Sequence, residues 1–367
     1  MLRRARILAP LATLVGLSFA FAQRRPPPPS ALFRGGAAPV VTGPAPSPLR
    51  GLDADDCAAC HAAIAAEWRV SLHAHAWRDD VFQASYRTEP DAFCRNCHAP
   101  LMAEGALVPD VRAAREGVSC AVCHVRDGHV LGTGSGRGDA APMADPHPLR
   151  VRADLATSAF CAGCHQFDFP AVPHAGATPS GEPMQDTWGE WSRSDAAARG
   201  QPCQHCHMPW RTDARGQRYR AHTFPGLDPD LLRRAVRVDV HVTRTAAALT
   251  VRATLRPGDI GHAFPTGDLF RQAELTAWID GDETTQRVAR FTRSYGATTS
   301  RRRHQSSDSR IPPPRGDTSR EVTLTLPVGA RVRWTLDHLR MSTEQALRQG
   351  VAVARNRTRV LDGYTTP

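Results

Sequence analysis

The sequence predicts an α+β protein with two domains: a loop-rich, mainly helical domain at residues 51–226 and an antiparallel β-sandwich at residues 230–367. Three observations lead to this prediction. The chain has 367 residues, enough for two domains that each bury a core. All ten cysteines and most histidines fall in the first segment, where Gly, Pro and Asp interrupt short helical stretches. After about residue 230, apolar and polar residues alternate with the period of half-buried strands.

The first 22 residues have the pattern of a secretory signal peptide. Three arginines precede an apolar run from Ile7 to Ala22, which ends in the small-x-small sequence Ala20-Phe21-Ala22. A membrane anchor is the alternative, but the run is short and Pro10 interrupts it. We therefore expect cleavage near Ala22, a periplasmic or otherwise exported protein, and no transmembrane span in the mature chain.

Residues 23–50 form a leader rich in Pro, Gly and Ala, for which disorder or a polyproline-like conformation is expected. The first helix is expected over residues 57–68, where alanines are closely spaced and a pair of aspartates precedes the segment as a cap.

Every cysteine of the chain belongs to a CxxCH motif. The five copies are CAACH (57–61), CRNCH (94–98), CAVCH (120–124), CAGCH (161–165) and CQHCH (203–207). Two cysteines three residues apart lie on one side of a helical turn, where they can form thioethers with the two vinyl groups of a porphyrin. The histidine that follows can bind the iron as the proximal ligand.

The repeated motif therefore predicts five covalently bound c-type haems. The thioether anchors would be Cys57, Cys60, Cys94, Cys97, Cys120, Cys123, Cys161, Cys164, Cys203 and Cys206. The proximal ligands would be His61, His98, His124, His165 and His207. His205, between two anchors, cannot reach the same iron and is expected to be peripheral.

Three other uses of CxxC pairs explain the pattern less well. Ten cysteines would make two tetrahedral zinc sites and leave one pair over, and zinc gives no reason for a histidine after each pair. Disulfides within five CxxC units would close loops too short to stabilise a fold. Redox dithiols do not occur five to a domain.

The formal charge of +10 falls to about +7 without the three signal-peptide arginines. The chain contains no lysine, and no basic stripe alternates with aromatic residues, so we expect no nucleic-acid partner. Five haems would also bring propionates that offset this charge, with arginines as their partners.

Distal ligands are sought among the remaining histidines. His73, in SLHAHA with His75 two residues on, is favoured. His147 lies in a Pro-flanked turn, and His222 follows the last motif, where a surface loop role is the alternative. His262 lies in the Gly- and Pro-rich loop GDIGHAFPTGD of the cysteine-free domain, and either reaches a haem across the domain boundary or has only a turn role.

Other candidates are less favoured. His129, His174 and His304 carry weaker signals, and Met102 and Met208 follow motifs closely enough to be axial ligands. His241 and His338 fall in predicted strands, where an outward or edge position is expected.

The second domain is expected to be a β-sandwich without cysteine. Alternation predicts strands in AVRVDVHVT (235–243), ALTVRATL (248–255), AELTAWID (273–280), EVTLTLPV (321–328) and RVRWTLDH (331–338). The basic stretch RRRHQSSDSR (301–310) is expected to be a solvated loop between strands.

Residues 55–226 resemble the multihaem c-type cytochromes related to the tetrahaem c-554 electron carriers. The resemblance rests on CAACH followed by EW and SLHAHA, on FCRNCHAPL, GVSCAVCH and FCAGCHQF, and on MQDTWGEW before CQHCHMPW. The loop GHAFPTG is similar to that of such cytochromes with an added β domain. The family implies a helical, loop-rich haem domain, mostly bis-histidine irons with His73 as one distal ligand, and closely packed haem pairs. The chain departs from it in having five motifs, not four, and a β domain.

The predicted function is electron transfer between redox partner proteins, whose identity the sequence does not give. The alternative is an oxidoreductase in which one open haem acts on a small nitrogen or sulfur compound. A nitrite-reductase site of the CxxCK kind is excluded because the chain has no lysine, and a hydroxylamine-oxidising enzyme of the known family would carry eight haems. A zinc-stabilised binding module is a third class, which a colourless protein would favour.

Overall fold

The computed structural model describes residues 40–102, 110–134, 147, 149–170, 179–214, 216–297 and 303–367. The predicted signal peptide and most of the predicted leader lie outside these residues. The last part of the leader, residues 40–50, has neither helix nor strand but contacts the body of the protein: the Gly128 amide donates to the Thr42 carbonyl at 2.9 Å.

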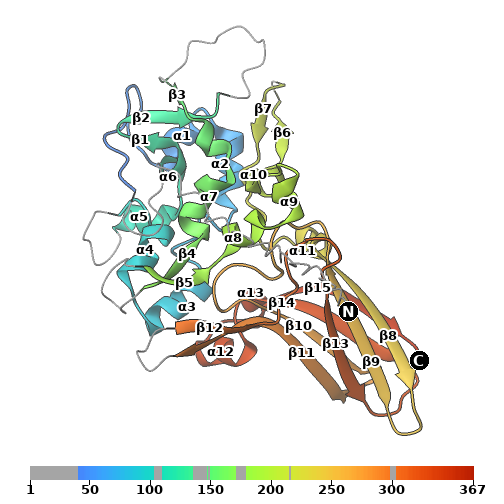
Figure 1. Cartoon of the computed structure of the whole chain (residues 1–367). Coiled ribbons are helices and arrows are strands. Elements are labelled where there is room, and N and C mark those ends of the chain that lie inside the picture. The colour runs from blue at the N-terminus through green and yellow to red at the C-terminus, as the bar shows by residue number, and fades with distance from the viewer. Residues whose placement is uncertain are drawn as a thin grey trace, which may run out of the picture.

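Short helices dominate the first part of the chain, which we call the helical region (Figure 1). They are α1 (Ala54–Ala58), α2 (Ala62–Arg69), α3 (Asp80–Thr88), α4 (Ala92–His98), α5 (Val111–Glu116), α6 (Cys120–His124), the 3₁₀ helix η1 (Ala153–Ala156), α7 (Ser158–His165), α8 (Thr187–Ser192), α9 (Asp195–Ala198) and α10 (Cys203–His207). Short strands lie between them: β1 (Val125–Arg126), β2 (His129–Gly132), β3 (Leu149–Val151), β4 (Phe167–Pro170), β5 (Pro179–Gln185), β6 (Trp210–Thr212) and β7 (Arg218–Arg220).

Aspartate caps start several of these helices. The side chains of Asp79, Asp91 and Asp110 each accept a backbone N–H of the following first turn. The single helix expected over residues 57–68 is wrong in its continuity, because α1 ends at Ala58 and α2 begins at Ala62. His61, between them, has non-helical backbone angles (φ −108°, ψ 43°), so the helix is interrupted at the last residue of the first motif.

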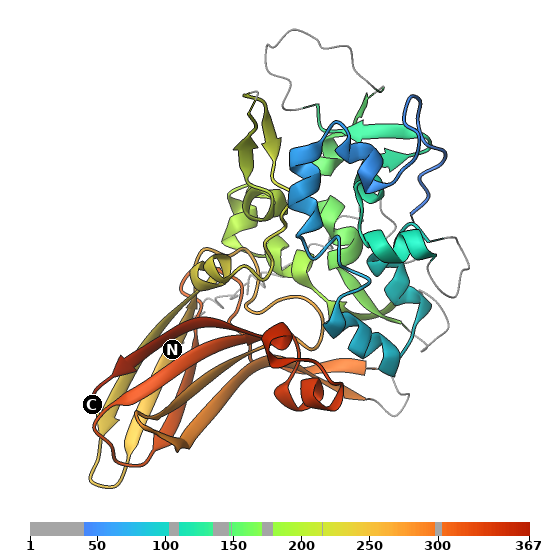
Figure 2. The ribbon, with the colours of Figure 1, turned by 180° about the vertical axis from the view of Figure 1, so that it is seen from behind.

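The second part of the chain, which we call the β region, is a sandwich of two antiparallel sheets (Figure 2). It contains α11 (Pro229–Ala235), β8 (Val236–Arg244), β9 (Leu249–Pro257), β10 (Gln272–Ile279), β11 (Asp282–Ala297), β12 (Arg303–Asp308), β13 (Arg320–Leu326), β14 (Val332–Leu339), α12 (Thr343–Arg348), α13 (Val353–Asn356) and β15 (Arg357–Thr365). One sheet has the strand order β12-β11-β10-β14-β15 and the other β13-β9-β8. The predicted α+β class with a C-terminal sandwich is confirmed.

An ordinary apolar core fills the sandwich, as expected for a region without cysteine. Leu255 of one sheet packs with Leu275 and Leu336 of the other, each at most 1% exposed. All five predicted strands are present. The expectation of a solvated loop at residues 301–310 is wrong: β12 pairs with β11 in this stretch, and the Arg310 side chain beyond it is buried.

The two regions share a packed interface at the lower end of the helical region in Figure 1. Val81 and Ala84 of α3 pack against Met341 and Ala346 of the β region. Next to this contact, the carboxylate of Asp79 accepts two hydrogen bonds, at 2.6 and 2.8 Å, from the guanidinium of Arg340, the residue that follows β14.

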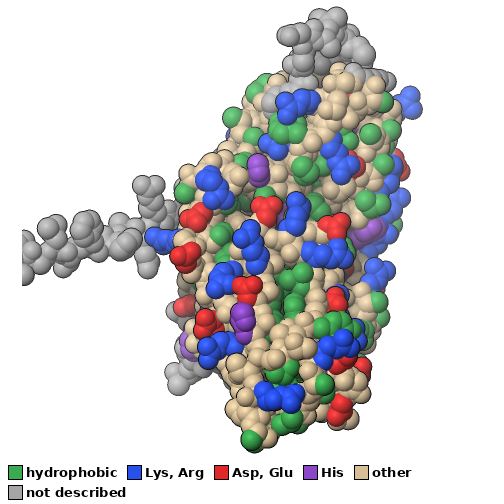
Figure 3. All heavy atoms as spheres, turned by 90° about the vertical axis from the view of Figure 1, so that its right-hand side faces the viewer, with side chains coloured by type: hydrophobic (Ala, Val, Ile, Leu, Met, Phe, Trp, Pro, Cys, Tyr) green, Lys and Arg blue, Asp and Glu red, His purple; other side chains and the backbone are tan. Residues whose placement is uncertain are grey.

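Charges of both signs are interspersed on the face of the molecule drawn in Figure 3. Across the described ranges, no helix combines the length and the apolar character that crossing a membrane requires.

Candidate haem-binding site

Four of the five CxxCH motifs end a short helix: α4, α6, α7 and α10 each stop at the motif's histidine. The first motif spans the break between α1 and α2. In each case a helical turn places the two cysteines on the same side, and the histidine follows directly after them. This is the arrangement that the spacing predicted. All ten cysteines are free of disulfides.

All fifteen cysteines and histidines of the motifs line one cavity of about 2350 Å³. A site for a single drug-sized ligand has roughly 300–1,000 Å³, so this cavity has room for several large groups. Aromatic and aliphatic side chains such as Trp68, Phe160 and Leu155 form much of its remaining wall. The cavity therefore fits a set of flat, apolar cofactors held in one shared interior.

Four of the motif histidines face a second imidazole across this cavity. The ring centres are 6.4 Å apart for His61 and His147, 6.3 Å for His165 and His73, 6.2 Å for His124 and His222, and 6.2 Å for His207 and His262. Two imidazoles on opposite sides of a metal, each bonded at about 2.0–2.1 Å, would have ring centres roughly 6–6.5 Å apart once the ring radii are added. All four pairs thus have the spacing that a metal ion between them requires.

These four partners are the four histidines that the sequence offered as distal ligands. The structure also assigns each to a motif, which the sequence did not: His147 to the first, His222 to the third, His73 to the fourth and His262 to the fifth.

The second motif differs from the others. Among the described residues, no imidazole lies opposite His98 at the spacing of the four pairs; its ring instead stacks on Phe82 of α3, with centres 3.7 Å apart and planes 8° apart. Phe82 belongs to an aromatic cluster with Trp77 and Tyr86.

Backbone carbonyls fix the outer nitrogen of several rings. The Nδ1 atoms of His98, His124, His222 and His262 lie 2.7–2.9 Å from the carbonyl oxygens of Ala76, Leu131, Arg220 and Ala263, respectively. A protonated Nδ1 donates to such a carbonyl, which leaves Nε2 as the lone-pair nitrogen for a metal. The rings are therefore held in the tautomer and orientation that iron ligation needs.

Burial keeps these imidazoles neutral, the form that binds metal. Burial, with smaller contributions from neighbouring histidines, lowers the pKa of His73 to about 3 and that of His207 to about 4. Burial likewise lowers the pKa of His165, His222 and His262 to about 4. His165 retains accessible surface, and it is one of the residues that line the cavity.

Cysteines of different motifs lie close together, and this proximity gives the spatial order of the motifs. Cys57 is close to Cys120, Cys97 to Cys164, and Cys161 to Cys203. Cys123 of the third motif is also near both cysteines of the fourth. The fourth motif thus neighbours the second, third and fifth, and the first motif neighbours the third.

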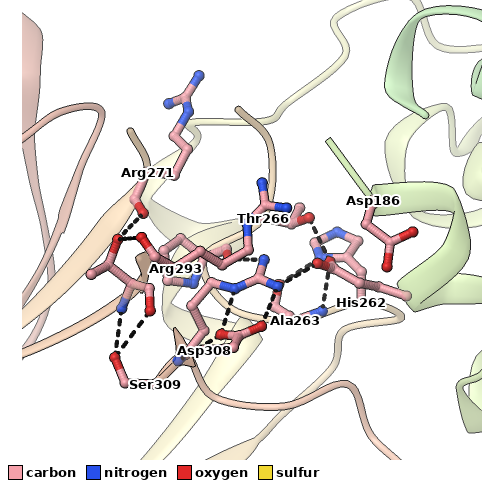
Figure 4. A network of polar contacts seen from close by, with 12 residues as sticks. Asp186, His262, Ala263, Thr266, Arg271, Arg293, Asp308 and Ser309 are labelled. Atoms are coloured by element: carbon pink, nitrogen blue, oxygen red, sulfur yellow. Dashed lines mark hydrogen bonds and ion pairs between the residues drawn. The ribbon is translucent and has the colours of Figure 1, made fainter. Parts of the chain in front are cut away.

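The loop that carries His262 extends from the β region into the helical region (Figure 4). There the Ala263 amide donates to the Oε2 of Glu190, a residue of α8, at 3.2 Å. The Thr266 hydroxyl donates to the same oxygen at 2.6 Å and lies 2.9 Å from the Thr187 hydroxyl. The cross-boundary position predicted for His262 is therefore present, and its ligand role remains a prediction.

Sequence reasoning was wrong about His338. An outward or edge position was expected, but the residue is only 4% exposed, lines the cavity, and its Nδ1 has no hydrogen-bond partner among the described residues. Burial, together with the charges of Arg271 and Arg340, lowers its pKa to about 3. Strand alternation cannot reveal this, because the strand end faces the helical region and not solvent.

The remaining candidates are placed as follows. His75, His129, His205 and His241 are exposed; His304 is partly buried in β12; and His174 lies outside the described residues. Met208 lines the cavity, whereas Met102 packs with Ala99 and Ala113 in a small apolar cluster.

A family model and one solved structure match this chain. The model of the family described as "Cytochrome c554 and c-prime" matches residues 56–125, the segment that holds the first three motifs. A search of curated proteins found no match.

The solved structure is a penta-heme cytochrome c552 from Thermochromatium tepidum. It is 20% identical, has a TM-score of 0.63, and the alignment covers 86% of this chain and 98% of that one. At this identity the likeness shows a shared fold. With the partial family match and the geometry above, it supports the conclusion that the chain is similar to the multihaem c-type cytochromes.

Proposed function

We propose that this chain is an exported pentahaem c-type cytochrome that passes electrons between periplasmic redox partners. The observation that carries the proposal is the set of four imidazole pairs, 6.2–6.4 Å between ring centres, in a cavity that all ten motif cysteines line. Iron with two histidine ligands has no position left for a substrate, which suits electron transfer more than catalysis.

The residues have distinct roles in this proposal. The ten cysteines would anchor the haems, and the motif histidines would be proximal ligands, with His73, His147, His222 and His262 as distal ligands. When bound, haem supplies one-electron chemistry at iron. The protein tunes the potential through burial and through the carbonyls that orient Nδ1.

The contacts between motifs favour a continuous path for electrons. The first motif touches the third, the third adjoins the fourth, and the fourth adjoins the second and the fifth. We therefore propose a branched path with its branch point at residues 161–165. We also propose that the haem domain spans residues 51–226 and the β domain residues 230–367.

Mass spectrometry of the purified protein tests the proposal directly. Five covalent haems should add roughly five times 616 Da to the chain that begins after the signal peptide. Optical spectra should show reversible reduction of all five. A colourless protein with free thiols or bound zinc would overturn the proposal.

The second motif supports a second candidate function, an oxidoreductase with one open haem. His98 has Phe82 beside it and no opposing imidazole among the described residues, so its iron could keep an axial position for a small nitrogen or sulfur compound. This candidate predicts one high-spin ferric haem by EPR, whose signal changes on adding nitrite or hydroxylamine. An entirely low-spin spectrum would contradict this second candidate, and electron transfer would be the one proposed function that stands.

A further inference from the structure

Glu190 is a buried carboxylate at the boundary between the helical region and the β region. It lies on α8 between Trp188 and Trp191 and is only 3% exposed. Its Oε2 accepts the two hydrogen bonds from the His262 loop described above, and its Oε1 lies 2.7 Å from a guanidinium nitrogen of Arg310. One carboxylate thus joins α8 to two segments of the β region.

A single residue, Ala263, connects Glu190 to the His262 imidazole. Glu190 holds the amide of Ala263, and the carbonyl of the same Ala263 lies 2.9 Å from Nδ1 of His262. The position of Glu190 therefore sets the position of the group that orients the ring. On its other side the ring faces His207 with the two planes only 12° apart, whereas the other three pairs are tilted by 37–52°.

Arg310 holds the same loop at Pro265, between the two residues that Glu190 binds. Its Nη1 donates to the Pro265 carbonyl at 3.1 Å, and its Nε and Nη2 donate to the two carboxylate oxygens of Asp308 at 2.9 and 2.7 Å. Arg310 as a whole is 5% exposed. The loop is therefore fixed directly after His262, by Glu190 at residues 263 and 266 and by Arg310 at residue 265.

Stability alone gives a weak reason for these buried charges. Taking a carboxylate and a guanidinium out of water costs several kcal/mol per ion, and apolar residues of similar volume often serve a fold as well or better. What apolar residues cannot do is fix the direction of the Ala263 amide and the Thr266 hydroxyl. Directional contacts that end on a ligand-bearing loop indicate a role in orienting that ligand.

We propose that Glu190 and Arg310 are positioning residues for His262, which hold its imidazole against His207 and thereby set the spin state and potential of the haem attached at Cys203 and Cys206. The inference rests on the proposed function. The helical region would in this way control the ligand that the β region supplies.

Three variants of the full-length, haem-loaded protein test this inference: Glu190→Ala, Glu190→Gln and His262→Ala. His262→Ala is the reference and should convert about one haem equivalent from low-spin to high-spin ferric signal in EPR. Glu190→Ala should lose the same low-spin component, or shift both its g-values and one of the midpoint potentials. Glu190→Gln keeps an acceptor for Ala263 and Thr266, so it should restore most of the wild-type signal.

Arg340→Met is the matched control, because it removes another buried ion pair of the same interface, at the His98 end. It should destabilise the protein but leave the His207–His262 component unchanged. If Glu190→Ala does not accumulate, Thr266→Val removes the hydroxyl that binds Glu190 and contacts Thr187, leaves Glu190 itself in place, and should still shift that component.

A lowered melting temperature with unchanged EPR and potentials in Glu190→Ala or Thr266→Val would overturn the inference. Haem content is measured first. A wild-type chain without five haems would contradict the proposed function. A Glu190→Ala variant with five haems and an unaltered spectrum would contradict only the role of Glu190.

Discussion

His73 and His75 are separated by one residue, yet they have different environments. The His73 ring lies 6.3 Å from that of His165 and 4.2 Å from that of Phe224. His75 is exposed, with its Nδ1 3.2 Å from an Arg78 nitrogen. The neighbouring histidines therefore form a matched pair for testing which side chain would serve the haem proposed at Cys161 and Cys164.

We expect His73→Ala to convert one low-spin haem to high-spin, because no second imidazole would then face His165. His75→Ala should leave the spectrum as in the wild type. EPR at low temperature and the optical high-spin band measure both effects. Equal spectra for the two variants would contradict the assignment of His73.

Residue by residue, the motifs predicted a shared site, and all fifteen of their cysteines and histidines line one cavity with the four predicted histidines opposite four of them. Their roles in haem attachment and ligation stay predictions. The pairing of each histidine with a motif could not be predicted, since it depends on tertiary contacts such as that between His61 and His147. Glu190 was also missed. Its signal was an acid between two tryptophans in TWGEW, a helical segment too apolar to be at the surface.

At the scale of elements, the strands of the β region follow the alternation in the sequence, whereas the helices that carry the CxxCH motifs are only one or two turns long. Helices this short are not stable alone and depend on what they pack against. The error at residues 301–310 has a related cause: exposed polar residues can still form an edge strand when a neighbour such as β11 offers its hydrogen bonds.

The contact between α3 and the end of β14 should contribute to the stability of the whole molecule. Arg340 and Asp79 are 11% and 15% exposed, and removing one partner of such a pair leaves a buried charge. We expect Arg340→Met to lower the free energy of unfolding by about 3 kcal/mol at neutral pH. Thermal melting followed by circular dichroism measures the loss.

The same pair predicts a pH dependence. Burial alone would raise the pKa of Asp79, but hydrogen bonds and charge from Arg340 lower it below its ordinary value. A carboxyl with a lowered native pKa adds stability above its unfolded pKa of about 3.9, and this stability is lost as the pH falls through the native value. The difference between wild type and Arg340→Met should therefore be largest near neutral pH and shrink as the pH falls toward and below about 4. A difference that stays constant to pH 3 would contradict this account.

For the whole molecule, the contacts of the fourth motif make it the centre of the arrangement. Replacing Cys161 and Cys164 with Ser should remove the haem that adjoins three others, and replacing Cys57 and Cys60 should remove one at an end. We expect the first variant to slow electron exchange among the remaining haems far more than the second. Stopped-flow reduction followed at several wavelengths would measure this, and equal rates would contradict the branched order.

The shared cavity has a consequence for how the protein is made. Without cofactors, the side chains around a cavity of about 2350 Å³ would lose many of their packing contacts, and a native domain is usually stable by only about 5–15 kcal/mol. Attachment of porphyrin and acquisition of tertiary structure should therefore be one event. Cells that cannot ligate haem to thiols should degrade this polypeptide instead of accumulating it.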